Sequence, residues 1–391
     1  MRNYFLFAVA LIVLSCTKKP NESIDNKLKT YSINNTSESV IPWNSLIQEI
    51  KFIPLETTPN SLVSEVDHLI IDNGNIYIQN FHNQVLQFSE DGKFKGQIGR
   101  KGRGPEEYLN VMDFQIRNNY VLILDSKSIR KYDTYGNYIS KLTWGKAEDI
   151  QLYANRFCYF NDNKYYLWNS SLDGTPAEQD CYLLHQVTDG KITKSLLPTQ
   201  FSGMANHRFY SMPNGNYHIR PTQYDNTVYE LSADTLIKAY QIDFGENNVQ
   251  IAKLKKGYSS EISDYNFDYI NENKKWSRVH YYFAENKQFL FFNFTSFQKE
   301  NDLSWALVNK ETHKTYVTQK LLIDDVLPVS MIGTDLKTDQ IIGIVTPQDI
   351  LKALKRNANL FDNLILSKED LAMLNQLKET DNVVLAKVRF K

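Results

Sequence analysis

Residues 99–108 hold the densest group of side chains in this chain that could bind a ligand. The segment reads Gly-Arg-Lys-Gly-Arg-Gly-Pro-Glu-Glu-Tyr, so Arg100 and Arg103 lie among three glycines. Backbone N–H groups left open by glycine, together with guanidinium groups, can hold a carboxylate, sulfate or phosphate. The segment is not a P-loop, because no Gly-Lys-Ser or Gly-Lys-Thr ends it. Arg100 and Arg103 are therefore candidates for binding a small anionic ligand, although such glycines are more typical of a tight crossing between blades with solvated charges.

Asp125, Arg220 and Asp225 are the other candidates for ligand binding, since each lies beside a predicted strand. Carboxylate and amide oxygens arranged in a ring can bind calcium, and a bound calcium can assist the hydrolysis of esters or lactones. The acidic residues show no regular spacing here, so we predict no metal site and no cofactor, and keep calcium as an alternative. Aspartate in such places more often caps a loop.

The remaining residues favour a protein without catalysis. The histidines show none of the HxH, HxxxH or HExxH spacings that are typical of zinc sites. No Gly-x-Ser-x-Gly elbow is present, as an α/β-hydrolase nucleophile would require. Aromatic residues within 281–283 and 289–297 could stack on a sugar, although alternating aromatics are more typical of a core. We therefore predict a binding or scaffolding module for a small anionic or sugar ligand.

The elements that would position these side chains are predicted by an internal repeat. Residues 75–95 and 120–140 each contain an apolar strand, a polar loop, an alternating strand and a turn with glycine, about 44 residues apart. A period of about 40–50 residues built from short strands is typical of a β-propeller blade. In a propeller, the loops after second strands and after fourth strands share one face. The five candidate residues would lie on that face.

Strand pairs recur four more times, which predicts an all-β fold, a six-bladed β-propeller, over residues 41–391. These pairs lie at 165–168 with 182–187, 217–220 with 227–231, 289–294 with 305–308, and 341–345 with 383–388. The alternating stretch 47–55 would supply the missing outer strand of the last blade and close the ring without an open edge.

Two segments interrupt this repeat. Residues 245–276 show only weak periodicity. Residues 347–380 predict two helices, a small helical insertion in the last blade. Thr346-Pro347 and Ser367 provide helix starts, and leucines follow at helical spacing. We expect this insertion to cover one rim of the ring.

The first residues have the pattern of a signal peptide. Arg2 precedes the apolar stretch 4–14, which is too short to span a bilayer. Val-Leu-Ser-Cys at 13–16 resembles the lipobox of bacterial lipoproteins, which implies cleavage before Cys16 and acylation of that cysteine. Several acyl chains give a stable anchor. We predict a signal peptide at residues 1–15 and a flexible, polar tether at 16–40.

Charge and cysteine content restrict the partners. Lysine and arginine number 44 against 45 acidic residues, so no global field favours nucleic acid. Cys158 and Cys181 fall on the predicted first and third strands of one blade. Because the second strand separates them, we predict free thiols rather than a disulfide, even in an exported protein.

Four motifs resemble those of the six-bladed β-propeller lipoproteins of the Bacteroidota, whose repeats are NHL-like. They are Phe-Ile-Pro-Leu-Glu-Thr-Thr at 52–58, Ile-Gly-Arg-Lys-Gly-Arg-Gly-Pro-Glu-Glu-Tyr at 98–108, Asp-Asn-Thr-Val-Tyr-Glu-Leu at 225–231 and Asp-Asn-Val-Val-Leu at 381–385. The resemblance covers roughly residues 45–390 and implies the architecture and the compartment more than any chemistry. The family often has Gly-Glu-Tyr in place of 106–108 and Asn-Pro in place of 382–383.

The resemblance also implies a location. Surface-exported lipoproteins of this group carry an acidic cluster after the lipidated cysteine, where this chain has Lys18 and Lys19. We therefore expect an outer-membrane lipoprotein on the periplasmic side, with the membrane and envelope proteins as partners. Two other functions stay open. One is a calcium-dependent hydrolase or lyase of small metabolites on the channel face. The other is an accessory protein-binding component of a glycan or peptide uptake system that uses the 347–380 helices.

Overall fold

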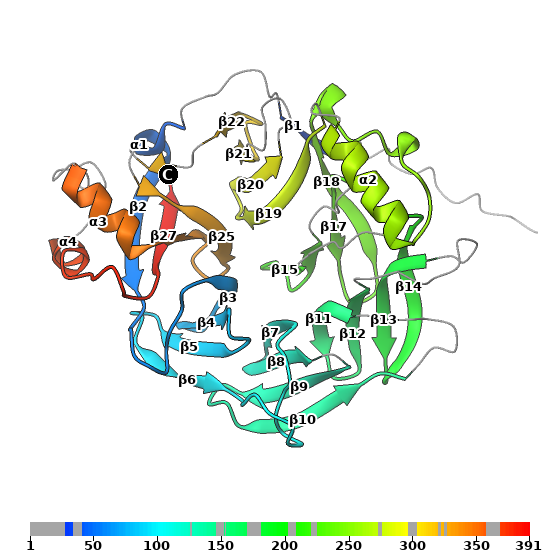
Figure 1. Ribbon diagram of the computed structural model, residues 1–391, viewed down its shortest axis with the longest axis horizontal. Coiled ribbons are helices and arrows are strands. Elements are labelled where there is room, and N and C mark those ends of the chain that lie inside the picture. Colours follow the sequence, from blue (N-terminus) through cyan, green and yellow to red (C-terminus); the bar gives the residue numbers. More distant parts are fainter. Residues whose placement is uncertain are drawn as a thin grey trace, which may run out of the picture.

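Six sheets form a ring around a central channel in the computed structural model, which confirms the predicted six-bladed β-propeller (Figure 1). The structure describes residues 28–33, 41–125, 127–145, 152, 154–169, 181–201, 209–219, 225–272, 276–295, 303–319, 322–323, 327–356 and 368–391. The first strand of each blade lies next to the channel and the last strand lies at the periphery.

The strands of the first three blades follow the chain in simple up-and-down order. Blade one contains β3 (Val66–Asp72), β4 (Asn75–Asn80), β5 (Val85–Ser89) and β6 (Phe94–Ile98). Blade two contains β7 (Asp113–Arg117), β8 (Tyr120–Asp125), β9 (Ser128–Asp133) and β10 (Tyr138–Thr143). Blade three contains β11 (Ala154–Asn161), β12 (Lys164–Asn169), β13 (Cys181–Thr188) and β14 (Lys191–Thr199).

The other three blades complete the ring. Blade four contains β15 (Phe209–Ser211), β16 (Tyr217–Ile219), β17 (Thr227–Leu231) and β18 (Leu236–Asp243). Blade five contains β19 (Arg278–Glu285), β20 (Phe289–Thr295), β21 (Leu303–Asn309) and β22 (Thr315–Thr318). Blade six contains β25 (Ser330–Asp335), β26 (Gln340–Val345), β27 (Val384–Phe390) and β2 (Ile47–Pro54), and a separate pair joins β23 (Leu322–Ile323) to β24 (Leu327–Pro328).

Turn chemistry explains why the chain reverses where it does. Asn73 and Gly74 have φ values of 46° and 73°, and Asp189 and Gly190 have φ values of 49° and 72°. Positive φ at both central residues defines the two-residue hairpin turn whose twist matches that of the strands. These turns join β3 to β4 and β13 to β14, so local sequence sets the register of the hairpins.

The ring closes between blade six and the segment before blade one, as predicted. β2 pairs antiparallel with β27, from Ile47 opposite Phe390 to Pro54 opposite Val384. Asn382, 3% exposed, donates its side-chain amide to the carbonyl oxygens of Glu56 and Ser61 at 2.8 and 2.7 Å. It also accepts the Val63 N–H at 2.8 Å. Two of the motifs that resemble the lipoprotein family, 52–58 and 381–385, thus form this closure.

Part of the predicted tether is ordered. β1 (Lys29–Ser32) lies within residues 16–40 and pairs parallel with β18, as a fifth strand of blade four. Tyr31 explains this placement, because its ring is 1% exposed and packs edge-on against Tyr240, with the ring centres 5.3 Å apart. Burial of Tyr31, together with that of Ile33 in the same apolar cluster, therefore holds this segment on the sheet.

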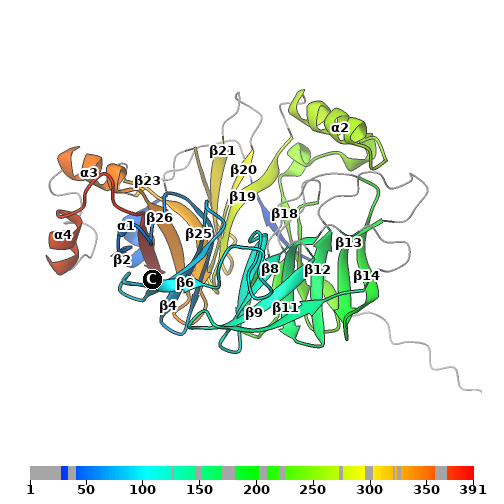
Figure 2. The same ribbon diagram turned by 60° about the horizontal axis from the view of Figure 1, so that its bottom comes forward.

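Helices lie outside the blades. α3 (Pro347–Arg356) and α4 (Lys368–Leu374) confirm the predicted insertion in the last blade. Figures 1 and 2 place them at the outer edge of blade six, and Ile350, Ala353 and Leu374 are buried in the apolar cluster there. α2 (Ser260–Glu272), in the weakly periodic segment 245–276, was not predicted. The described residues also form three short helical turns, α1 (Trp43–Leu46), η1 (Gly245–Asn247) and η2 (Ile251–Lys253).

The core is divided among the blade interfaces, which leaves the axis of the ring for a channel. Tyr77 and Phe114 pack between blades one and two, and Leu124 and Phe157 between blades two and three. The aromatic residues of β20 are buried in the same way, so their rings are not open to a sugar. Within the described parts of the chain, no helix has the length and apolarity needed to cross a bilayer.

Candidate functional site

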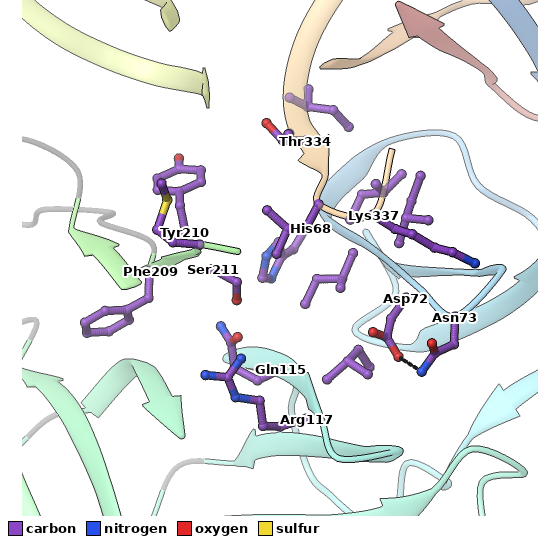
Figure 3. A pocket seen from close by; sticks show the side chains of 18 of the residues that line it. His68, Asp72, Asn73, Gln115, Arg117, Phe209, Tyr210, Ser211, Thr334 and Lys337 are labelled. Atoms are coloured by element: carbon purple, nitrogen blue, oxygen red, sulfur yellow. Dashed lines mark hydrogen bonds between the residues drawn. The ribbon is translucent and has the colours of Figure 1, made fainter. Parts of the chain in front are cut away.

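A cavity of about 420 Å³ occupies the central channel (Figure 3). Its walls come from β3, β7, β15 and β25, with Glu285 at the end of β19. These strands are the innermost strands of blades one, two, four, six and five. The cavity therefore exists only when the ring is assembled.

The cavity lies toward the face made by the hairpins between first and second strands. Asp72, Arg117 and Ser211 are the last residues of β3, β7 and β15, and all three line it. Asn73 and Lys337 line it from the hairpins that follow β3 and β25. This is the opposite face of the ring from the one on which the sequence placed Arg100, Arg103, Asp125, Arg220 and Asp225.

His68 lines one part of the wall and contacts a buried aspartate that does not itself line the cavity. Nδ1 of His68 lies 3.2 Å from Oδ1 of Asp113, which is 2% exposed. The other oxygen of Asp113 accepts the Phe157 N–H at 3.2 Å. These contacts compensate the cost of burying the carboxylate, and they orient the His68 ring beside the cavity.

Two further side chains of β7 reach the same wall. Gln115 is 2% exposed, and its amide nitrogen has no hydrogen-bond partner among the described atoms. Arg117 donates from Nη2 to the carbonyl oxygen of Gly215, and its guanidinium carbon lies 5.2 Å from the ring centre of Tyr217. Figure 3 shows the ends of Gln115 and Arg117 side by side. An unpaired buried donor costs about 1–3 kcal/mol, so a ligand acceptor at Gln115 would remove a penalty.

Glu285 also lines the cavity, but its carboxylate is already paired. Oε2 lies 2.9 Å from Nδ1 of His218 and accepts the Tyr240 hydroxyl at 2.7 Å, while Oε1 accepts Nζ of Lys310 at 2.6 Å. Burial raises the pKa of this carboxyl, but the hydrogen bond and charge of His218 and the charge of Lys310 outweigh burial and bring the pKa to about 2. Glu285 thus stabilises the contact between blades four and five.

The glycine-rich segment 99–108 binds a carboxylate from its own chain. Oε2 of Glu107 accepts the Gly104 N–H at 2.9 Å, and a Cβ at position 102 would lie 1.9 Å from the same oxygen. Arg100 and Arg103 are exposed, and neither lines the cavity. Because the glycines leave room for it, Glu107 of the same segment binds the backbone N–H that an external anion could have used. The motif thus forms the tight structural crossing between blades one and two.

Asp125 fixes the end of the same crossing. It is 4% exposed and accepts the N–H groups of Leu109 and Asn110 at 3.2 and 3.3 Å. Its Oδ2 also accepts Nη1 of Arg130 at 2.5 Å. Asp125 thus acts as a loop cap with a charged partner.

Asp225 has a comparable arrangement in blade four. It accepts the Thr227 N–H at 2.9 Å and the Tyr229 hydroxyl at 2.8 Å. Arg220 lies outside the described residues. The structure therefore does not bring the described members of the predicted set together in one cavity.

The described residues also bear on whether the chain could hold a metal ion or present a reactive thiol. In the parts of the chain that the structure describes, no three His, Cys, Asp or Glu side chains converge to hold a metal ion. Cys158 and Cys181 are free and buried, as predicted from their strands.

Sequence reasoning missed His68, Gln115 and Arg117. A signal was present in Asp113-Phe-Gln-Ile-Arg117, where polar residues alternate with apolar ones along a first strand. Alternate side chains of a strand share one face, so this spacing aligns three polar groups. The signal lies on a strand that faces the axis, whereas the predicted residues lie in or beside the loops, where propellers usually bind ligands.

The fold agrees with that of a solved structure. A Bacteroides fragilis protein named as an exported protein superposes with a TM-score of 0.70 at 19% identity, over 93% of this chain and 99% of its own. A member of the DUF4221 family from Bacteroides vulgatus reaches a TM-score of 0.48 at 10% identity, over 88% of this chain and 97% of its own. No functionally curated protein matches the chain. The family model described as "Domain of unknown function (DUF4934)" matches residues 28–389, and this chain therefore belongs to that family.

Proposed function

We propose that this protein is a lipid-anchored β-propeller of the cell envelope that binds a small ligand in its central channel and catalyses no reaction. The cavity carries this proposal. Its volume of about 420 Å³ falls in the range of small-molecule sites, about 300–1,000 Å³. It combines a few oriented polar groups with aliphatic walls such as Ile71, Ile116 and Ile332, and that combination is typical of ligand pockets.

The location rests on the N-terminus and on a relative. The lipobox-like sequence at 13–16 and the name of the Bacteroides fragilis structure both favour export. The absence of an acidic cluster beside Lys18 and Lys19 favours the periplasmic side of the outer membrane. The Cys16→Ser variant should move the protein from the membrane fraction to the soluble fraction, and retention in the membrane fraction would contradict lipidation.

Binding can be tested by thermal-shift screening of the purified full chain with organic acids, sugars, amides and calcium. A ligand at [L] = 100 Kd stabilises a protein by about 2.7 kcal/mol, which gives a clear shift. Ser211 faces the cavity in Figure 3, so Ser211→Phe should fill it and abolish the shift. Ser260→Phe, an equal change at an exposed position on α2, should keep the shift. A shift that survives in Ser211→Phe, or no shift with any compound, would contradict the proposal.

The calcium-dependent alternative has less support. Among the described residues, the acids that line the cavity are Asp72 and Glu285, and Glu285 is held by Lys310 and Tyr240. Calcium requires about six to eight oxygen ligands. The calcium arm of the screen keeps this alternative open to measurement.

A further inference from the structure

The donors at the cavity wall restrict the chemistry of the ligand. Gln115 brings a buried amide nitrogen without a partner, and Arg117 brings a guanidinium held in place by Gly215 and Tyr217. Ser211 and His68 line the same cavity (Figure 3). The four side chains come from β7, β15 and β3, so three blades converge on this spot.

Charge adds a second restriction. Arg117 and Lys337 line the cavity as cations, and Asp72 lines it as an anion. Asp72 accepts the side-chain amide of Asn73 at 3.1 Å, at the rim of the cavity. Glu285 adds no free negative charge, because Lys310 lies 2.6 Å from its carboxylate. Among the described side chains that line the cavity, with Glu285 paired to Lys310, Arg117 and Lys337 exceed Asp72 by one positive charge, which one negative charge would balance.

Resting on the proposed function, we propose that the channel ligand is a small monocarboxylic acid with an apolar body. Its carboxylate would accept hydrogen bonds from the Gln115 amide and the Arg117 guanidinium. Guanidinium and carboxylate groups match in shape as well as in charge.

The cavity also has apolar side chains that suit the body of such an acid. Ile71, Ile116 and Ile332 line it from three different blades, and Met212 adds a flexible apolar side chain. Aliphatic and thioether groups accept an apolar chain and offer nothing to a second carboxylate. A doubly charged ligand such as phosphate would exceed the positive charge of the lining. A neutral sugar would leave the guanidinium without its best partner.

The test compares each acid with its own neutral amide. Hexanoate and phenylacetate, with hexanamide and phenylacetamide, are titrated into the purified full chain by calorimetry. We expect both acids to bind at least tenfold more tightly than their amides, because hydrogen bonds to a charged group are about twice as strong as neutral ones.

Variants locate the contact. Gln115→Glu places a negative charge at the donor and should weaken binding of the acids at least tenfold, while Gln376→Glu, an exposed change in the helical insertion, should not. Gln115→Met removes the donor without adding charge, and this second variant tests the same contact if Gln115→Glu does not fold. Unchanged binding of the acids in Gln115→Met would place them elsewhere and overturn the proposal.

The outcomes separate the ligand class from the function. If amides bind as tightly as acids, or only sugars bind, and Ser211→Phe abolishes that binding, the carboxylate assignment is wrong and channel binding stands. If no compound of either class or of the wider screen binds in the channel, both proposals are wrong.

Discussion

Replacing Glu285 by glutamine tests a buried charge contact between blades four and five. This carboxylate is 3% exposed in the salt bridge to Lys310, and it joins β19 of blade five to His218 and Tyr240 of blade four. Glutamine keeps the size and one acceptor oxygen, so the change removes the charge and leaves the packing. Lys310 and His218 would then face a neutral amide in a largely buried setting.

The magnitude follows from the pKa of the carboxyl. Its ordinary value is 4.5 and in the folded protein it is about 2, because the hydrogen bond and charge of His218 and the charge of Lys310 outweigh burial. When folding lowers the pKa of an acid, the charged form stabilises the folded protein. This stabilisation is fully present at pH values above the unfolded pKa, and it is lost as the pH falls through the folded pKa. The difference is worth about 3 kcal/mol at pH 7, and about 1 kcal/mol of it remains at pH 3.

The assay is urea unfolding of both proteins at pH 7 and pH 3, followed by tryptophan fluorescence. We expect Glu285→Gln to lower the free energy of unfolding by about 3 kcal/mol at pH 7 and by about 1 kcal/mol at pH 3. Glu311→Gln, an exposed change in the β21–β22 turn, should have an effect below about 0.5 kcal/mol. A loss of equal size at both pH values would refute the electrostatic reasoning.

Three further changes test the closure, a turn and a buried histidine. Asn382→Ala removes three hydrogen bonds and should lower the free energy of unfolding by about 3 kcal/mol; a loss below about 1 kcal/mol would contradict its role in closing the ring. Gly92→Ala should cost at least about 2 kcal/mol, because φ is 85° and the new Cβ would lie 2.2 Å from a backbone oxygen, whereas Gly145→Ala should be nearly neutral on thermal melting. Burial lowers the pKa of His185 to about 4, below its ordinary 6.5, so the free energy of unfolding should fall by about 3 kcal/mol as the pH drops from 6.5 to 4. In urea unfolding at different pH values, His185→Gln should not show this fall.

The architecture could be predicted because local signals and the repeat agree. Glycine with a positive φ marks hairpin turns at positions 74 and 190, and alternating apolar residues supply the faces that pack between blades. The closing strand 47–54 was also visible, since its alternation matches the strand that it pairs with.

Two elements could not be predicted from local sequence. β1 has only four residues, and its partner β18 lies about 200 residues away, so nothing near Lys29–Ser32 indicates the pairing. α2 contains Tyr265, Phe267 and Tyr269, which favour strands by propensity. Its helical form depends on burial of Ile270 against Trp276, a contact that exists only after folding.

The site was missed for a related reason. Residues 99–108 have the composition of an anion-binding loop, and the carboxylate they hold is Glu107 of the same segment. Gln115 and Arg117 look like ordinary strand residues until the ring places β7 beside the channel. Composition thus indicates which groups could bind, while ring closure decides which of them face a common space.

β1 also determines how the propeller would bear a mechanical load. Tension that arrives from residues before Lys29 enters at the end of β1 that lies level with Tyr240, beside the middle of β18. Pulling along the strand strains all the evenly spaced hydrogen bonds of this parallel pair together, whereas pulling across it would break them one at a time. A protein pulled along β1 by an N-terminal tether would resist detachment in shear, because the Tyr31 ring is buried among side chains of blades four and five.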